Sequence, residues 1–338
     1  MSLGASPPLR VLIVKLSSLG DVVHAMAAVQ DLLRAHPAAQ VDWVVERAFA
    51  PVVARCAGVH RTIPCELRTW RKRPFASSTR KAWSAFKADL QRDAYDAVID
   101  LQGLSKSALV AWLAQTRVGG LRYAMANRTE GSGYEAPTRW VADRAIALVP
   151  HVHAVQRSRL LCAQALGYAL QGEARFGLSP QGPGAVRPAG VSARPLVALV
   201  HGTSRADKEW PLAHWISLGQ RLNQQGFCVA LAHGSAAEQA VSEAIAAQLA
   251  DAWVWPRLAL DTLVDTMAGC AGVIGVDSGL SHIAVALGLP HVQLYNFDTA
   301  WRTGVATAHQ VCIHGSPVPA LEAVWQAWEG LALPVVSR

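Results

Sequence analysis

Residues 273–282 read Val-Ile-Gly-Val-Asp-Ser-Gly-Leu-Ser-His, and this stretch decides how the second half of the chain folds. Its apolar start predicts a buried strand, Asp277-Ser278-Gly279 predicts a tight turn, and residues 280–287 predict a helix. Free N–H groups at the beginning of such a helix, together with the helix dipole, favour a bound anion such as a diphosphate. A plain helix cap formed by Asp277 or Ser278 is the alternative interpretation.

The same alternation of apolar runs and helical patterns extends outward from this stretch in both directions. Strands are predicted at residues 10–16, 41–45, 59–63, 96–101, 196–201, 227–232, 273–276 and 291–295. Helices are predicted at residues 22–36, 48–57, 76–93, 105–114, 153–166, 211–225, 236–249, 260–268, 280–287 and 320–331. We expect residues 115–150 to be rich in loops. Repeated βαβ units predict an α/β fold with two Rossmann-like, doubly wound parallel sheets and ligands at the carboxyl ends of their strands.

The length of 338 residues favours two domains. A segment rich in glycine and proline separates the two series of βαβ units, so we predict an N-terminal domain at 1–175, a linker at 176–195 and a C-terminal domain at 196–338. Apolar residues make up 51% of the chain and charged residues 16%, which excludes wholesale disorder.

Compartment and partners follow from composition. We find no apolar run long enough to span a bilayer and no signal-peptide core in residues 1–9, so we expect a cytoplasmic protein. The six cysteines are scattered without a CxxC pair, which predicts buried thiols. Residues 1–175 carry a net charge of +10 and residues 176–338 a net charge of −3, which together give the +7 of the chain. The N-terminal half should therefore meet an anionic partner, of which nucleic acid and acidic lipid are the candidates.

The loop after the first strand reads Ser17-Ser18-Leu19-Gly20-Asp21. It contains neither GxGxxG nor a Walker A motif, which disfavours a dehydrogenase and a P-loop enzyme. Asp21 occupies the expected N-cap of the next helix. A cap is one interpretation, and a general base at the mouth of the cleft is the other.

A basic run with interleaved aromatic residues follows the third strand. Arg68, Arg71 and Lys72 begin it, and Lys106 opens a later helix. A solvated helix face is one interpretation of the run, and an anion clamp is the other, because guanidinium groups suit carboxylates and phosphates. No DNA- or RNA-binding motif accompanies these residues.

The loop after the first strand of the second half carries Thr203, Ser204 and Lys208, which is the composition of a phosphate cradle or of an ordinary turn. Glu238 follows the next strand, where a carboxylate could accept hydrogen bonds from ribose hydroxyls. The chain has no Asp-x-Asp and no HExxH, so we expect no metal and no other cofactor, with leaving-group charge met by Lys208, hydroxyls and backbone amides.

Taken together, these residues resemble the lipopolysaccharide heptosyltransferase I family. The resemblance rests on residues 11–24, on Trp70-Arg71-Lys72, on residues 95–107 and 201–210, and on residues 277–282. It spans nearly the whole chain and implies a GT-B glycosyltransferase that moves L-glycero-D-manno-heptose from ADP-heptose to the inner-core Kdo of Kdo-lipid A, with inversion, at the cytoplasmic face of the inner membrane of Gram-negative bacteria.

The resemblance also implies residue roles. Asp21 would be the catalytic base. The donor would be bound by Thr203, Ser204, Lys208, Glu238, Asp277, Ser278, Gly279, Leu280 and His282, and the acidic acceptor by Ser18, Gly20, Arg68, Arg71, Lys72 and Lys106. Ser204 and Ser278 stand where the family is expected to have Thr, and both keep a hydroxyl group. The partners implied are ADP-heptose, Kdo-lipid A and the anionic membrane surface, without nucleic acid.

Three other functions stay open from the sequence. A related GT-B transferase with a different nucleotide-sugar donor would share the same motifs. A non-catalytic nucleotide- or lipid-binding module would not need Asp21. A nucleic-acid binder would show salt-sensitive affinity for DNA or RNA.

Overall fold

A computed structural model of the chain describes residues 7–305 and 307–331. Residues 1–6, 306 and 332–338 lie outside this description. The outer ends of the two predicted domains, and most of the segment 1–9 that was examined for a signal peptide, therefore lie outside the described residues. The chain divides into two compact units at Leu178/Ser179. This division falls inside the predicted linker at 176–195.

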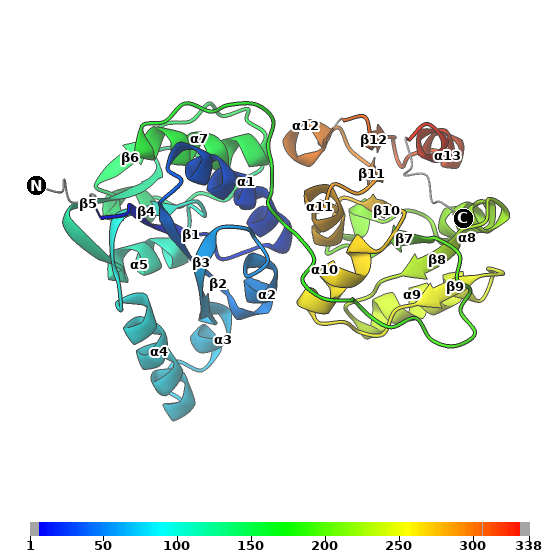
Figure 1. Ribbon diagram of the computed structural model, residues 1–338, viewed down its shortest axis with the longest axis horizontal. Coiled ribbons are helices and arrows are strands. Elements are labelled where there is room, and N and C mark those ends of the chain that lie inside the picture. Colours follow the sequence, from blue (N-terminus) through cyan, green and yellow to red (C-terminus); the bar gives the residue numbers. More distant parts are fainter. Residues whose placement is uncertain (1–6, 306, 332–338) are drawn as a thin grey trace, which may run out of the picture. The chain divides into compact units, whose positions relative to one another are not determined.

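The N-terminal unit contains one six-stranded parallel sheet in the order β3-β2-β1-β4-β5-β6 (Figure 1). Its strands are β1 (Arg10–Val14), β2 (Gln40–Glu46), β3 (Val59–Cys65), β4 (Ala94–Asp100), β5 (Gln115–Met125) and β6 (Arg144–Ile146). Its helices are α1 (Leu19–Ala35), η1 (Arg47–Phe49), α2 (Ala50–Val53), α3 (Leu67–Lys72), α4 (Ser77–Leu90), α5 (Ser105–Leu113), α6 (Pro137–Val141) and α7 (Ala154–Leu166).

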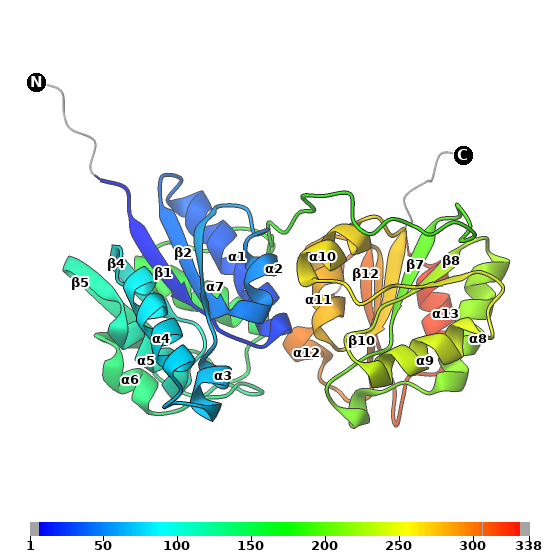
Figure 2. The ribbon, with the colours of Figure 1, turned by 90° about the horizontal axis from the view of Figure 1, so that it is seen from below.

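The central strand β1 is covered on both faces, because Val11, Leu12, Ile13 and Val14 are all fully buried. Leu12 and Val14 pack with side chains of α3, α4 and α5. On the other face α1 and α7 pack side by side (Figure 2), and a buried Arg159–Asp31 pair joins them with Nε–Oδ2 at 2.6 Å. Continuous apolar runs in the sequence thus correspond to strands buried on both sides.

The C-terminal unit repeats this architecture with the order β12-β11-β10-β7-β8-β9. Its strands are β7 (Leu196–Val200), β8 (Cys228–Leu231), β9 (Ala252–Val254), β10 (Gly272–Val276), β11 (His291–Tyr295) and β12 (Gln310–His314). Its helices are η2 (Ala206–Lys208), α8 (Leu212–Gln224), α9 (Ala236–Ala246), α10 (Leu260–Ala268), α11 (Gly279–Ala286), α12 (Ala300–Thr303) and α13 (Leu321–Glu329). The core against α8, α9 and α13 contains the fully buried Trp328.

The predicted α/β class with two doubly wound parallel sheets is confirmed, and α10 and β11 begin and end at the predicted residues. The expectation of loops at 115–150 is wrong, because the eleven-residue strand β5, α6 and β6 lie there. The strands β9 and β12 and the short helix α12 were not predicted. Five of the six cysteines are buried and all six are free thiols. Within the described part of the chain, no helix is both long and apolar enough to cross a membrane.

The close packing of β10 against Trp328 can be tested by enlarging Gly272. A Cβ at Gly272 would lie 2.7 Å from the ring of Trp328 and 3.0 Å from the carbonyl oxygen of Pro290. Trp328 is fully buried and has no room to retreat. We therefore expect Gly272→Ala to lower the free energy of unfolding by about 1–3 kcal/mol, measured by chemical denaturation.

The matched control for this substitution is Gly269→Ala. A Cβ at Gly269 would meet its nearest neighbour, the Thr266 carbonyl oxygen, at an ordinary 3.5 Å. Equal stability changes in the two variants would show that the β10–Trp328 contact is not tight.

Candidate active site

The loop between β1 and α1 positions Asp21 through a capping box. Ser18 is the N-cap of α1, and its backbone N–H and hydroxyl donate to Asp21 Oδ2 at 3.2 and 2.9 Å. The prediction that Asp21 is the N-cap itself is therefore wrong, since Asp21 is the third residue of the helix. The reason is that a short Ser side chain fits the extended backbone before the helix, while a carboxylate three residues later reaches back to it. Gly20 is buried in the same turn.

The second carboxylate oxygen of Asp21 faces two buried cations. Lys15 Nζ lies 3.9 Å and Arg157 Nη2 lies 3.7 Å from Oδ1. Burial of the carboxyl group opposes ionisation, but Lys15, His24 and Arg157 outweigh it and hold the pKa of Asp21 well below its ordinary value. About 36% of the Asp21 side chain remains exposed. The result is an accessible carboxylate that stays ionised at neutral pH.

The hydroxyl of Ser17 brings two of the predicted acceptor-binding residues to this loop. Lys106 Nζ and Arg68 Nη2 donate to Ser17 Oγ at 3.0 and 3.2 Å. The Gln102 side chain also holds the loop in place, because its Oε1 accepts hydrogen bonds from the backbone N–H groups of Leu16 and Ser17. Arg68 and Lys106, distant in sequence, thus meet beside Ser18.

The remaining predicted acceptor residues, Arg71 and Lys72, lie in the last turn of α3 and are exposed. Within residues 7–305 and 307–331, no hydrogen bond or ion pair joins either side chain to the Ser17–Asp21 loop. Arg68 thus contacts the loop from the first turn of α3, while Arg71 lines a groove together with Lys106.

Two buried carboxyl groups near this loop were missed from the sequence. Asp100 ends β4 and accepts hydrogen bonds from the backbone N–H of Gln102 at 2.8 Å and from the hydroxyl of Ser107 at 2.9 Å. Burial raises its pKa to about 6, although these donors act in the opposite direction. Burial also raises the pKa of Glu46, which lies beside Arg68 and Lys106. Asp100 and Glu46 each end an apolar strand, and this position in the sequence was the signal that could have identified them as residues near the site.

In the C-terminal unit, Asp277 is the centre of a buried polar cluster. Lys208 Nζ donates to its Oδ2 at 2.5 Å, and His282 Nε2 lies 3.3 Å from its Oδ1. Asp277 is 6% exposed. Burial opposes ionisation, but His282 and Lys208 outweigh it and hold the pKa of Asp277 below its ordinary value. Three predicted donor-binding residues from two loops are thus brought together.

The helix α11 begins at this cluster. Ser278 is its N-cap, but the Ser278 hydroxyl caps no N–H group and is buried without a hydrogen-bond partner among the described residues. Gly279 and Leu280 form the first turn and are partly exposed. The alternative that Asp277 or Ser278 merely caps the helix through its side chain does not describe this turn, because the Asp277 carboxylate is turned to Lys208 and His282.

Glu238 lies where the loops after β7 and β8 meet. Its carboxylate accepts the backbone N–H of Gly234 at 2.6 Å. A Cβ at Gly202 would lie 2.9 Å from this carboxylate, so the glycine leaves the space that Glu238 occupies. Thr203 and Ser204 follow Gly202 on the same loop, partly exposed and exposed.

Asn296, which no sequence motif marks, fixes the loop that carries Lys208. Its Nδ2 donates to the carbonyl oxygens of Asp207 and Glu209, both at 2.9 Å. These carbonyls lie on either side of Lys208 in the chain. Asn296 follows β11, so the loops after β7 and β11 are held together at the residue that meets Asp277.

Two Rossmann-like units of this topology, one with an accessible carboxylate and one with a lysine and a helix N-terminus at the carboxyl ends of the strands, are the architecture of a GT-B glycosyltransferase. Residues 83–324 match glycosyltransferase family 9 (heptosyltransferase). The chain therefore belongs to glycosyltransferase family 9, and it is an enzyme of the heptosyltransferase class.

Individual relatives agree with this assignment. The chain is 39% identical over 323 residues to lipopolysaccharide heptosyltransferase 1 of Pseudomonas aeruginosa, covering 92% of this chain and 85% of that protein. The structure of the E. coli heptosyltransferase WaaC with ADP superposes with a TM-score of 0.84 at 31% identity, over 95% of this chain and 99% of that one. The same enzyme with ADP-2-deoxy-2-fluoro heptose gives a TM-score of 0.79 at the same identity and coverage. These findings confirm the predicted resemblance and support heptose transfer in lipopolysaccharide core biosynthesis.

The role of Asn296 in holding the backbone on either side of Lys208 can be tested by removing its side-chain amide. In Asn296→Ala, the carbonyl oxygens of Asp207 and Glu209 lose their donor, so we expect faster hydrogen exchange of the backbone amides at 206–209. The free energy of unfolding should fall by about 1–2 kcal/mol. Mass spectrometry of exchanged peptides and chemical denaturation measure the two effects.

Asn223→Ala is the matched control, because Asn223 Nδ2 also donates to two backbone carbonyl oxygens, those of Phe227 and Asp251. Asn223 Oδ1 also accepts the backbone N–H of Asp251, so this variant should lose at least as much stability, without changing exchange at 206–209. Unchanged exchange at 206–209 in Asn296→Ala would contradict the anchoring role.

Proposed function

We propose that this chain transfers L-glycero-D-manno-heptose from ADP-heptose to the inner-core Kdo of Kdo-lipid A with inversion at the anomeric carbon. The observation that carries the proposal is the accessible, ionised Asp21 carboxylate, oriented by Ser18 in a family 9 enzyme. A carboxylate in this state can accept a proton from an acceptor hydroxyl without being activated by another residue.

In the proposed reaction, Asp21 takes the proton from the Kdo hydroxyl while the hydroxyl oxygen attacks the anomeric carbon. The bond from that carbon to the ADP oxygen breaks, and ADP leaves with the bonding electron pair. One displacement with one base inverts the anomeric centre. Lys106 and Arg68, which meet at Ser17 beside the base, supply positive charge for the acidic acceptor.

We assign the donor to the C-terminal unit. Lys208, the hydroxyls of Thr203, Ser204 and Ser278, and the N–H groups of Gly279 and Leu280 at the beginning of α11 would bind the diphosphate. Glu238 would accept from the ribose, and Asp277 and His282 would line the heptose side. The structures of the E. coli enzyme with ADP and with ADP-2-deoxy-2-fluoro heptose support ADP-heptose as the donor by similarity.

The proposal includes no metal ion and no other cofactor. Within the described residues no group of three His, Cys, Asp or Glu side chains is placed to hold a metal ion. Charge on the leaving diphosphate would instead be met by Lys208 and by N–H and O–H donors. We further propose that the enzyme works in the cytoplasm, at the surface of the anionic inner membrane, where its lipid acceptor resides.

The low pKa of Asp21 has a consequence for this mechanism. A carboxylate that two cations hold ionised is a weak base. An acidic acceptor that binds near Lys15 and Arg157 would offset their charge and raise the pKa of Asp21 when the proton must be taken. The cations would then keep Asp21 deprotonated before the acceptor binds, and the bound acceptor would increase the basicity of Asp21.

Replacing the base tests the proposed reaction. We expect Asp21→Ala to lower kcat by about 10²–10⁴-fold, because the acceptor hydroxyl keeps its proton. ADP release from ADP-heptose and Kdo-lipid A, assayed in EDTA, measures the rate. ADP affinity should stay close to that of the wild type, while the melting temperature should fall, because the variant loses the capping box and the carboxylate partner of Lys15 and Arg157.

Turnover of Asp21→Ala within a few-fold of the wild type would remove Asp21 as the base. If the wild type lost turnover in EDTA and a divalent metal restored it, the proposal of a metal-free reaction would be wrong, while the role of Asp21 would be unaffected.

The pH dependence tests the electrostatic control of Asp21. Lys15 makes the largest contribution that lowers the pKa of this carboxyl group. The base works when deprotonated, so the acidic limb of kcat/KM should lie below the ordinary aspartate range. Lys15→Met keeps the length of the buried side chain and removes its charge, so the limb should move to higher pH.

The control for the pH profile is Lys87→Met, which removes an exposed charge from α4. It should leave the limb where it is in the wild type. An acidic limb that does not move in Lys15→Met would show that another group sets it.

A further inference from the structure

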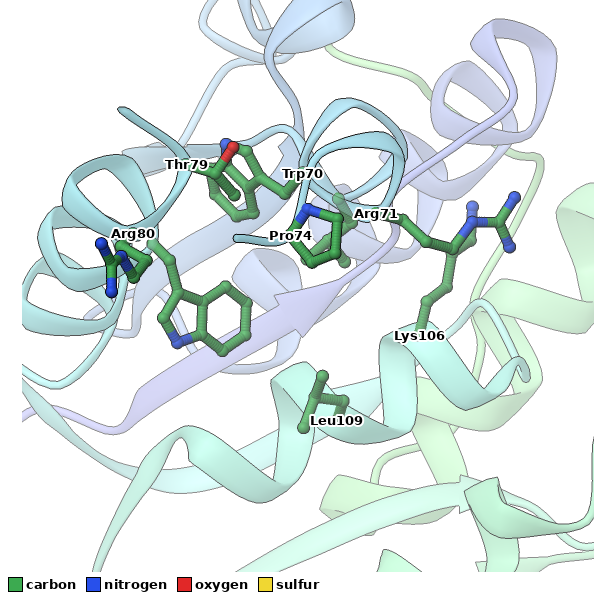
Figure 3. A pocket seen from close by; sticks show the side chains of 9 residues that line it. Trp70, Arg71, Pro74, Thr79, Arg80, Lys106 and Leu109 are labelled. Carbon is green, nitrogen blue, oxygen red and sulfur yellow. The ribbon is translucent and has the colours of Figure 1, made fainter. Parts of the chain in front are cut away.

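An apolar groove of about 390 Å³ lies in the N-terminal unit among side chains of α3, α4 and α5 (Figure 3). Its wall is formed by Trp70, Trp83, Pro74 and Leu109. The Trp70 ring meets the Trp83 ring edge-on with centroids 5.7 Å apart, and Trp70 is nearly buried. The wall is therefore a packed aromatic surface that exists before anything binds.

Both ends of the groove are cationic. Figure 3 shows Arg80 at one end, with Arg71 and Lys106 at the other. Residues 67–86 contain six Lys or Arg and no Asp or Glu. In the part of the chain that the structure describes, no carboxylate forms an ion pair with Arg71 or Arg80. The groove thus presents carbon along its length and, at its two ends, the charges of Arg71 and Arg80, which no described carboxylate pairs.

Large apolar side chains around the groove are open to water. Phe75, in the turn between α3 and α4, is 91% exposed. On α5, Leu109 is 41% and Trp112 is 61% exposed. These two residues are three apart, so they lie on the same side of the helix. Such a patch with a charged rim marks an interaction surface.

We propose that this surface docks the N-terminal unit onto an anionic phospholipid bilayer, with Phe75 among the acyl chains and one acyl chain in the groove. Lipid phosphates would pair with Arg80 and its basic neighbours. The inference deepens the membrane contact proposed above by naming the surface that makes it.

A bilayer fits these features better than an acidic peptide does. A peptide backbone needs hydrogen-bond partners along its length, and the groove wall offers mainly carbon. Phe75 stands outside the groove, so one small molecule in the groove would leave it in water. An acyl layer beneath a sheet of phosphates supplies both kinds of contact at once.

The test is co-sedimentation of the full chain with phosphatidylcholine vesicles that contain or lack phosphatidylglycerol. We expect binding only to the anionic vesicles. Phe75→Ser should weaken it by about tenfold and Arg80→Gln by about fivefold. Leu109→Gln should weaken it in the same direction.

Two matched controls keep the result specific. Leu212→Gln alters a leucine on α8 that is 44% exposed, close to the 41% of Leu109. Lys87→Gln removes a charge from α4, the helix of Arg80, at a position that does not line the groove. Vesicle binding of both should stay within twofold of the wild type. A fall in the controls equal to that in the groove variants would overturn the proposal.

Turnover separates this surface from the acceptor site. With a deacylated, water-soluble Kdo acceptor and no vesicles, Phe75→Ser, Leu109→Gln and Arg80→Gln should keep the wild-type kcat/KM. Loss of that activity would place the groove in the acceptor site and overturn the proposal. The proposal would also be overturned if the three variants bound anionic vesicles as well as the wild type does, or if the wild type bound poly-glutamate as well as it binds the vesicles. Wild-type inactivity on the soluble acceptor would count against the proposed function, while vesicle binding would still be judged separately.

Discussion

Burial of the central strands on both faces is the constraint on which the rest of the structure depends. Val11 to Val14 of β1 and all residues of β10 are buried, so polar groups are placed where the chain leaves the carboxyl end of each strand. Asp21 follows β1 and Asp277 follows β10 in this way. Asp21 is held by Lys15 from its own loop and by Arg157 from α7. Asp277 is held by Lys208 from the loop after β7. These cations are needed because a carboxylate at the rim of a core is unfavourable without them.

Strands that are buried throughout could be predicted from the sequence, whereas the half-exposed strands β5 and β12 could not. The strand β11 is buried throughout and was predicted to the residue. In β5, by contrast, most of the first eight residues are exposed or half-exposed, and Gly119 adopts φ +81° beside an irregular register with β4. No alternation of apolar and polar residues survives there. The edge strand β12 is only partly buried and was missed for the same reason.

The candidate site divides in a similar way between local and long-range information. Asp21, Lys208 and Asp277 lie in motifs that the sequence displays, and their residue types suggested their chemistry. Arg157 comes from α7, far along the chain from Asp21, and Asn296 comes from the loop after β11. These residues set the charge and the position of the motif residues through contacts that only the fold creates.

The two units treat positive charge differently, and this difference follows from what each is proposed to bind. Lys208 is already neutralised by Asp277, so a diphosphate there would gain from backbone N–H groups, from the unpartnered Ser278 hydroxyl and from Lys208 only as its pairing to Asp277 weakens. On α3 and α4 the cations have no such partner among the described residues. A small nucleotide can be recognised by a few preorganised dipoles, since its charge is concentrated at one point. An extended anionic surface is met by side chains that remain in water and act over several ångströms, which is the state of Arg71 and Arg80.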